Sequence, residues 1–132
     1  MKHVMITALF VALLACEQSS RVQDCDSNEI ACTYDLRHII ITIAENDEPV
    51  QLTRMVVEID GVIQINEEID DFNEFGTYTL LSDEHMNLVE QSGSDVSFSG
   101  FRGDDRVIDQ NYLVGHDCCH IQLLEGPIEI KL

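Results

Sequence analysis

The pattern of apolar and polar positions predicts a chain built from short β-strands. From Leu36 onward, short runs rich in Ile, Val, Leu and Tyr are separated by Gly, Asn and Asp, and no long stretch has helical periodicity. In "IEIKL", for example, Ile128, Ile130 and Leu132 share one face of the expected strand, and the charged residues between them share the other. The expected strands span residues 36–43, 53–60, 62–66, 77–82, 95–101, 106–114, 118–124 and 128–132.

Turn signals between these runs favour an antiparallel arrangement. Asp60 and Gly61 lie between two strand patterns, and Asp-Gly is typical of a type I′ hairpin turn, which needs positive φ at both central residues. A short helix is expected only within residues 82–91. Frequent turns between short strands therefore predict an all-β fold, an antiparallel β-sandwich of seven to eight strands.

The first residues carry a secretory signal. Lys2 is followed by an apolar run from Val4 to Ala15 that only Thr7 interrupts. A run of about twelve residues is too short for a transmembrane helix, which needs roughly twenty. Residues 1–15 are therefore expected to be a signal peptide that is removed from the mature protein.

The end of this signal resembles the lipobox of bacterial lipoproteins. The residues "LLAC", Leu13 to Cys16, imply cleavage before Cys16 and attachment of lipid to its thiol and new amino group. Two or more acyl chains would hold the protein stably on a membrane. The resemblance implies a bacterial cell-envelope protein, at the outer membrane or cell surface, whose contact with the membrane is the lipid on Cys16. The alternative is an ordinary signal peptide in which the cysteine is accidental.

The chain after Cys16 divides into a polar tether and one domain. Residues 16–31 begin with the expected lipidated cysteine and continue as a stretch rich in Gln, Ser, Asp and Glu, with little apolar surface to bury. Residues 32–132 are long enough for one domain with its own core and too short for two. The expected organisation is therefore signal peptide, tether and β-sandwich.

The charge of the chain excludes several classes of partner. The formal net charge is −18 at pH 7, and loss of Lys2 with the signal would make it more negative. Such a surface repels nucleic acid and anionic lipid headgroups, so no nucleic-acid partner is expected. The acids are spread over several segments, which is typical of a solvated acidic surface. A calcium site among the loop acids is the alternative, although an EF-hand is excluded because Phe75 and Ser82 occupy ligand positions.

Four cysteines remain once Cys16 is assigned to lipid. Outside the cytoplasm these four, which form an even set, are expected to be oxidised to disulfides, and they allow three connectivities. A bond between Cys118 and Cys119 is disfavoured because adjacent side chains on a strand point to opposite faces. The four residues are Cys25, Cys32, Cys118 and Cys119.

The stretch "HDCCH" also suggests a transition-metal site. If residues 118–124 form a strand, Cys119 points into the core with Ile121, whereas His116, Cys118 and His120 share the opposite face. A thiolate and two imidazoles are ligands for copper or zinc. A single ion would require Cys118 to be reduced, and the strand to bend, because the two histidines start roughly 13 Å apart.

Several short motifs, in this order, resemble the bacterial transthyretin-like (prealbumin-like), carboxypeptidase-regulatory-like β-sandwich domains. The resemblance implies a Greek-key sandwich that serves as an accessory or binding module without catalysis, and it implies a Cys32–Cys119 disulfide, which leaves Cys25 for Cys118. The region after Phe101 is more acidic than expected for the family. The motifs are Cys32 before the first strand, "EPV" at 48–50, "EIDG" at 58–61, "FGTYTL" at 75–80, "SGF" at 99–101 and "CHI" at 119–121.

These observations favour a binding or structural role. The chain contains no G-x-S-x-G, H-E-x-x-H or phosphate-binding glycine motif, so neither an enzymatic activity nor a cofactor is expected. The leading hypothesis is a membrane-anchored, non-catalytic envelope lipoprotein that binds a protein or a glycan. The alternatives are a metal-binding envelope protein, for copper, zinc or calcium, and a hydrolase whose site has no recognisable motif.

Overall fold

β-Strands make up just over half of the residues that the computed structural model describes, which are 24–26 and 29–132. The expected signal peptide and Cys16 lie outside the described residues. Within the described ranges, no helix has the length and apolar character needed to cross a bilayer. The elements are β1 (His38–Glu45), β2 (Glu48–Pro49), β3 (Arg54–Ile59), β4 (Val62–Glu68), β5 (Thr77–Ser82), η1 (Asp83–Leu88), β6 (Ser94–Arg102), β7 (Asp105–His116), β8 (Ile121–Glu125) and β9 (Glu129–Lys131).

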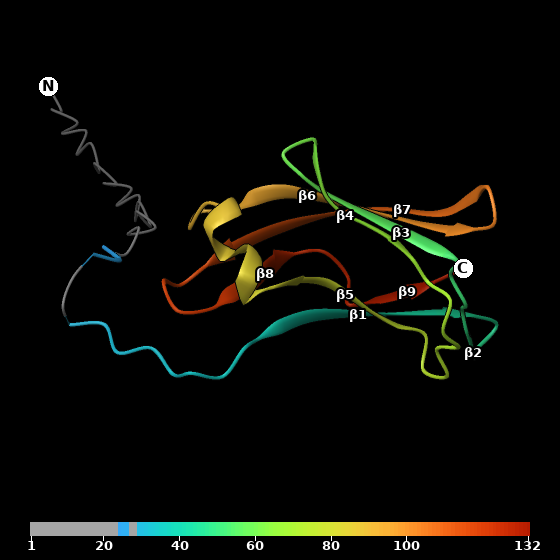
Figure 1. The fold of residues 1–132 in the computed structure, drawn as a ribbon, viewed down its shortest axis with the longest axis horizontal. Helices are drawn as coiled ribbons and strands as arrows, with labels where there is room; N and C mark the ends of the chain where they lie inside the picture. The colour runs from blue at the N-terminus through green and yellow to red at the C-terminus, as the bar shows by residue number, and fades with distance from the viewer. Residues whose placement is uncertain (1–23, 27–28) are drawn as a thin grey trace, which may run out of the picture.

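The strands form two sheets that face each other (Figure 1). In the smaller sheet, β1 pairs antiparallel with β2 and β5 and parallel with β9. The larger sheet has the order β4-β3-β6-β7-β8, and all its neighbours are antiparallel. The expected all-β architecture with mostly antiparallel pairing is therefore confirmed. The described residues form nine strands rather than seven or eight, because the sequence pattern gave no signal for the two-residue strand β2.

The core lies between the two sheets and follows the period-two alternation of the strands. In β3, Met55, Val57 and Ile59 are buried, whereas the residues between them are only partly covered. In β6, Val96 and Phe98 are buried in the same way. Each large apolar side chain that leaves water in this manner contributes about 1.5–3 kcal/mol. The alternation seen in the sequence therefore decides which face of each sheet points inward.

A β-bulge in the smaller sheet adds one apolar side chain to the core. The register between β1 and β5 shifts between Ile39 and Ile40, and Leu80 is the residue on β5 without an opposite partner. An extra residue in one strand lets two consecutive side chains point to the same side. Leu80 and Leu81 are accordingly both fully buried, with 0% of their surface exposed.

The turn and helix predictions agree with the structure in outline. Asp60 and Gly61 have φ values of 49° and 79° and join β3 to β4, as expected for a type I′ hairpin. The short helix expected within residues 82–91 is the 3₁₀ helix η1. The strand expected at 118–124 is wrong at its beginning, because β8 starts only at Ile121.

The two ends of the sandwich differ in character (Figure 1). One end carries the start of β1, η1 and the connection from β7 to β8, and we call it the stapled end because two disulfides lie there. The opposite end carries β2, the connection from β4 to β5 and the C-terminus, and we call it the far end. Strand β1 runs from the stapled end to the far end over about 23 Å.

Two buried tyrosines differ in their hydrogen bonding. The hydroxyl of Tyr78 donates to the carbonyl of Val50 at 2.7 Å and accepts from the backbone N–H of Leu52 at 2.9 Å. In the described part of the chain, the hydroxyl of Tyr112 is buried with no hydrogen-bond partner. Burial raises the pKa of Tyr112 to about 12. The two hydroxyls should therefore affect stability in opposite directions.

We expect Tyr78→Phe to lower the free energy of unfolding by about 1–3 kcal/mol, because the N–H of Leu52 would lose its acceptor inside the core. Tyr112→Phe should cause no loss and should raise stability by up to about 1 kcal/mol, because it removes a hydroxyl that is buried without a partner. Urea unfolding of both variants measures the difference. Equal losses in the two variants would contradict the assignment.

Candidate functional site

Residues 117–120 of the "HDCCH" stretch form a loop between β7 and β8, and two disulfides attach it to the N-terminal segment. Cys118 is bonded to Cys25 and Cys119 is bonded to Cys32. The pairing that the family resemblance implied is therefore confirmed. Gln91 also donates from its side-chain amide toward the sulfur atoms of Cys25 and Cys118. The loop thus covers the end of the sandwich and holds the chain that precedes β1.

Asp117 gives this loop its turn conformation. One oxygen of its carboxylate accepts from the backbone N–H groups of Cys119 at 3.1 Å and His120 at 2.8 Å, and the other accepts from the side chain of Gln122 at 2.7 Å. The backbone N–H of Asp117 donates to the carbonyl of His120 at 3.1 Å, and Cys118 has a φ of 79°. These local bonds replace the strand ladder over residues 117–120.

The turn corrects the side-chain directions that the strand pattern predicted. Residues 118–120 do not alternate between two sheet faces, so Cys119 is only partly buried and does not join the core. His120, which was expected on the outer face with His116 and Cys118, is buried with 5% of its surface exposed. The error arose because apolar and polar residues alternate here as in a strand, whereas an aspartate directly before the cysteines favours a turn.

His120 connects two segments that are distant in sequence. Its Nδ1 lies 2.8 Å from Oδ2 of Asp83, and its Nε2 lies 3.0 Å from the hydroxyl of Thr33. Asp83 also accepts from the backbone N–H of Arg37 at 2.8 Å and from that of Ile121 at 2.7 Å. The carboxylate of Asp83 therefore joins the start of β1, η1 and the start of β8.

The carboxyl groups around His120 are held in their ionised form. Burial by itself would raise the pKa of Asp83, but the hydrogen bonds from His120, Ile121 and Arg37 outweigh it and leave the pKa below the ordinary value of 3.8. Asp117 shows the same balance, because hydrogen bonds outweigh burial and lower its pKa. Both carboxylates are therefore stabilised as anions in the folded protein.

The arrangement does not provide the soft metal ligands that the sequence suggested. Cys118 is part of a disulfide, so its thiolate is not available. Nδ1 of His116 accepts from the backbone N–H of Cys118 at 3.2 Å, and both ring nitrogens of His120 have hydrogen-bond partners. Among the described residues, no group of three or more His, Cys, Asp or Glu side chains is arranged to hold a metal ion.

Hydrogen bonds link the hydroxyl of Thr33 to the ring of His120, and that ring to the carboxylate of Asp83, as in a hydroxyl–histidine–carboxylate triad. In a hydrolase the carboxylate orients the histidine and the hydroxyl attacks the substrate. Here the carboxylate also holds two backbone N–H groups, and the imidazole is buried, which are properties of a structural bridge. The sequence analysis missed Thr33 and Asp83, because they are far from His120 in the chain and no spacing links them.

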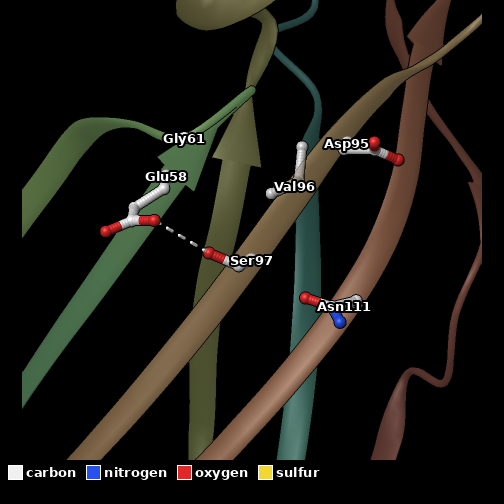
Figure 2. A pocket seen from close by; sticks show the side chains of 6 residues that line it. All are labelled: Glu58, Gly61, Asp95, Val96, Ser97 and Asn111. Atoms are coloured by element: carbon white, nitrogen blue, oxygen red, sulfur yellow. Dashed lines mark hydrogen bonds between the residues drawn. The ribbon is translucent and has the colours of Figure 1, made fainter.

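A shallow depression lies on the outer face of the larger sheet (Figure 2). It has a volume of about 380 Å³, and the side chains around it come from the β3–β4 hairpin, β6 and β7. Ser97 donates to the carboxylate of Glu58 across it at 3.5 Å. Val96 is the apolar side chain of the lining and is itself buried, and the other side chains around the depression, those of Glu58, Asp95, Ser97 and Asn111, are polar.

No family model, no curated protein and no solved structure matches this chain. The site is therefore interpreted from its own geometry. That geometry is a disulfide-bonded loop whose His120, together with Asp83 of η1, joins the N-terminal segment, η1 and β8.

We expect the two disulfides to contribute to stability in a strongly non-additive way. They link positions separated by 93 and 87 residues, so they close nearly the same loop. In the chain-entropy model, replacing either pair with serine should cost about 2.5 kcal/mol, because the remaining bond still closes the long loop. Replacing all four cysteines should cost about 7 kcal/mol.

Guanidinium unfolding of the C25S/C118S, C32S/C119S and fourfold variants tests this coupling. Wild-type protein treated with a strong reductant is the matched control and should unfold like the fourfold variant. Losses from the two pairs that simply add to the loss in the fourfold variant would contradict the model.

We expect Asp83→Asn to destabilise the protein by about 1–3 kcal/mol at neutral pH, because an amide cannot accept all three of the hydrogen bonds that the carboxylate accepts. A lowered pKa stabilises the fold above the unfolded value of 3.8, and this contribution disappears as the pH falls through the folded value. The difference from wild type should therefore be largest above about pH 5 and should narrow at lower pH.

Thermal unfolding between pH 2 and pH 7 measures this difference. Glu84→Gln is the matched control, because Glu84 lies next to Asp83 in η1 and is exposed. A constant difference at all pH values would show that the charge of Asp83 has no stabilising role.

Proposed function

We propose that this protein is a non-catalytic binding module of the bacterial cell envelope, held on a membrane by lipid on Cys16 and presenting its sandwich to a protein partner. The observation that carries the proposal is the Cys25–Cys118 disulfide, which attaches the segment that follows Cys16 directly to the folded domain. A disulfide in this position also agrees with an oxidising compartment.

The position of this disulfide limits how far the domain can stand from a lipid anchor. An extended chain covers at most about 3.3–3.6 Å per residue, so Cys16 and Cys25 can be separated by about 30 Å. With Cys16 in the membrane, we place the stapled end toward the bilayer, because the anchored segment joins the domain at that end. The far end would then point away from the bilayer, because β1 runs from one end to the other.

The chemistry of the "HDCCH" loop supports binding rather than catalysis. Both of its cysteines are oxidised, and His120 is buried between Asp83 and Thr33. The oxidised cysteines have no thiolate that could attack a substrate, and His120 holds the stapled end together through its bonds to Asp83 and Thr33. We therefore infer that the protein works by binding a partner through its surface.

The Greek-key connection of transthyretin-like domains is part of this proposal. The chain changes sheets repeatedly, since β5 belongs to the smaller sheet and lies in sequence between β4 and β6 of the larger one. Antiparallel order within the larger sheet and frequent changes of sheet are features of Greek-key sandwiches, which often serve as binding modules.

We expect Cys16→Ser to move the protein from the membrane fraction to the soluble fraction, because the acyl chains that hold it would be absent. The wild-type protein should have an intact mass that corresponds to cleavage before Cys16 plus its lipid. Fractionation together with intact-mass measurement tests both statements, and the C25S/C118S variant is the control that should keep the anchor. A wild-type protein with an unmodified Cys16 would overturn the proposed anchoring.

A further inference from the structure

The connection between β4 and β5 exposes two aromatic side chains. This segment, residues 69–76, is called the aromatic loop below. Phe72 has 81% of its surface exposed and Phe75 has 66%. Two large aromatic residues in water within one loop are unusual, because each would gain free energy if it were buried. Exposed apolar groups with polar residues around them often mark a site of protein association.

The aromatic loop is held in one conformation by Asn73. The backbone N–H of Asn73 donates to the side-chain carbonyl of Gln51 at 2.8 Å, and its own carbonyl accepts from the amide of Gln51. The side-chain oxygen of Asn73 accepts from the N–H groups of Phe75 and Thr77, each at 3.3 Å. These bonds attach the loop backbone to the sandwich, so the part of the backbone that carries the aromatic residues has less conformational entropy to lose on binding.

Gly76 lets the end of the loop pack tightly against the smaller sheet. It has a φ of 59°, and a Cβ atom at this position would lie 2.5 Å from the carbonyl oxygen of Ile43. The carbonyl of Gly76 accepts from the N–H of Ile43 at 2.8 Å. The base of the loop is therefore fixed to β1 at the far end of the sandwich.

The surroundings of the two phenylalanines are strongly acidic. Asp70, Asp71 and Glu74 lie in the same loop and are exposed. Asp47 in the neighbouring β1–β2 turn and Glu48 at the start of β2 are also exposed. A partner that covers the phenylalanines must therefore also meet these carboxylates, and a positively charged rim would compensate them.

We propose that the aromatic loop binds a partner protein whose apolar pocket is bordered by lysine or arginine side chains, with Phe72 and Phe75 as the two anchors. This inference rests on the proposed function, since it names the surface and the partner of the same binding module. Exposed aromatic anchors inserted into a pocket provide most of the free energy in many interfaces, and the charged rim sets orientation and partner choice.

Charge and position argue against other occupants of this surface. A second copy of the chain would bring a net charge of −18 toward another of −18, and acidic loops would face each other. An anionic membrane would repel the same carboxylates, and with a lipid anchor on Cys16 the far end points away from the bilayer. A basic protein surface is the occupant whose charge is complementary.

Photocrosslinking on intact cells tests the proposal with the full chain. Phe72 is replaced by p-benzoylphenylalanine, which keeps an aromatic ring at the anchor position, in the bacterium that makes the protein. The same replacement at Val62, which is 60% exposed at the β3–β4 hairpin, and at Ile40, which is 52% exposed on the smaller sheet, gives matched controls. Peptide mass spectrometry then identifies the crosslinked residues of the partner.

We expect a protein adduct from position 72, absent from positions 62 and 40, whose crosslinked site is an apolar surface bordered by lysine or arginine. The combined variant Asp70→Asn, Asp71→Asn and Glu74→Gln should lower the adduct yield about tenfold, because it removes the charge attraction. Asn73→Ala keeps both phenylalanines but releases the loop, and it should also lower the yield. The melting temperature of each variant confirms that it is folded.

The remaining outcomes separate failure of this inference from failure of the proposed function. An adduct from position 62 or 40 but not from 72 would overturn the aromatic loop as the surface and leave the binding function in place. An adduct with lipid, with a second copy of the chain, or with a protein site without basic residues would overturn the proposed kind of partner. No adduct from any position would overturn both.

Discussion

The carboxylate of Asp83 is the interaction on which the stapled end depends. It accepts hydrogen bonds from the backbone of Arg37 before β1, from the backbone of Ile121 at the start of β8, and from the ring of His120. β1 and β8 belong to different sheets, so this one group connects both layers at the stapled end. Strong hydrogen bonds to an ionised group outweigh its burial here, and they explain why the pKa of Asp83 is lowered.

The disulfides act on the same region in a different way. They restrict the unfolded chain and fasten residues before β1 to the β7–β8 loop, whereas Asp83 sets the native geometry of that loop. Together they use nearly all of the groups in "HDCCH" that could otherwise have bound a metal or attacked a substrate. The "HDCCH" stretch, which resembles a reactive motif in the sequence, thus holds the stapled end of the sandwich together.

The two ends of the sandwich consequently differ in how they are held. The stapled end is joined to the N-terminal segment by two disulfides and by the hydrogen bonds of His120 to Thr33 and of Asp83 to Arg37. The far end carries the aromatic loop, where hydrogen bonds to Asn73 hold a segment with two exposed phenylalanines. A scaffold with a fixed attachment at one end and a preorganised apolar loop at the other is suited to presenting that loop to a partner.

Local patterns in the sequence determined most of the strands, the Asp60–Gly61 hairpin and the short helix, because alternation and turn chemistry depend only on neighbouring residues. They failed at residues 118–120, where the side chain of Asp117 competes with strand pairing. Only the tertiary structure decided that His120 forms hydrogen bonds with Thr33 and Asp83, and that Asn73 forms a hydrogen bond with Gln51. These hydrogen bonds join residues that are far apart in the chain. They form because of how the two sheets pack, and the spacing of residues along the chain does not predict them.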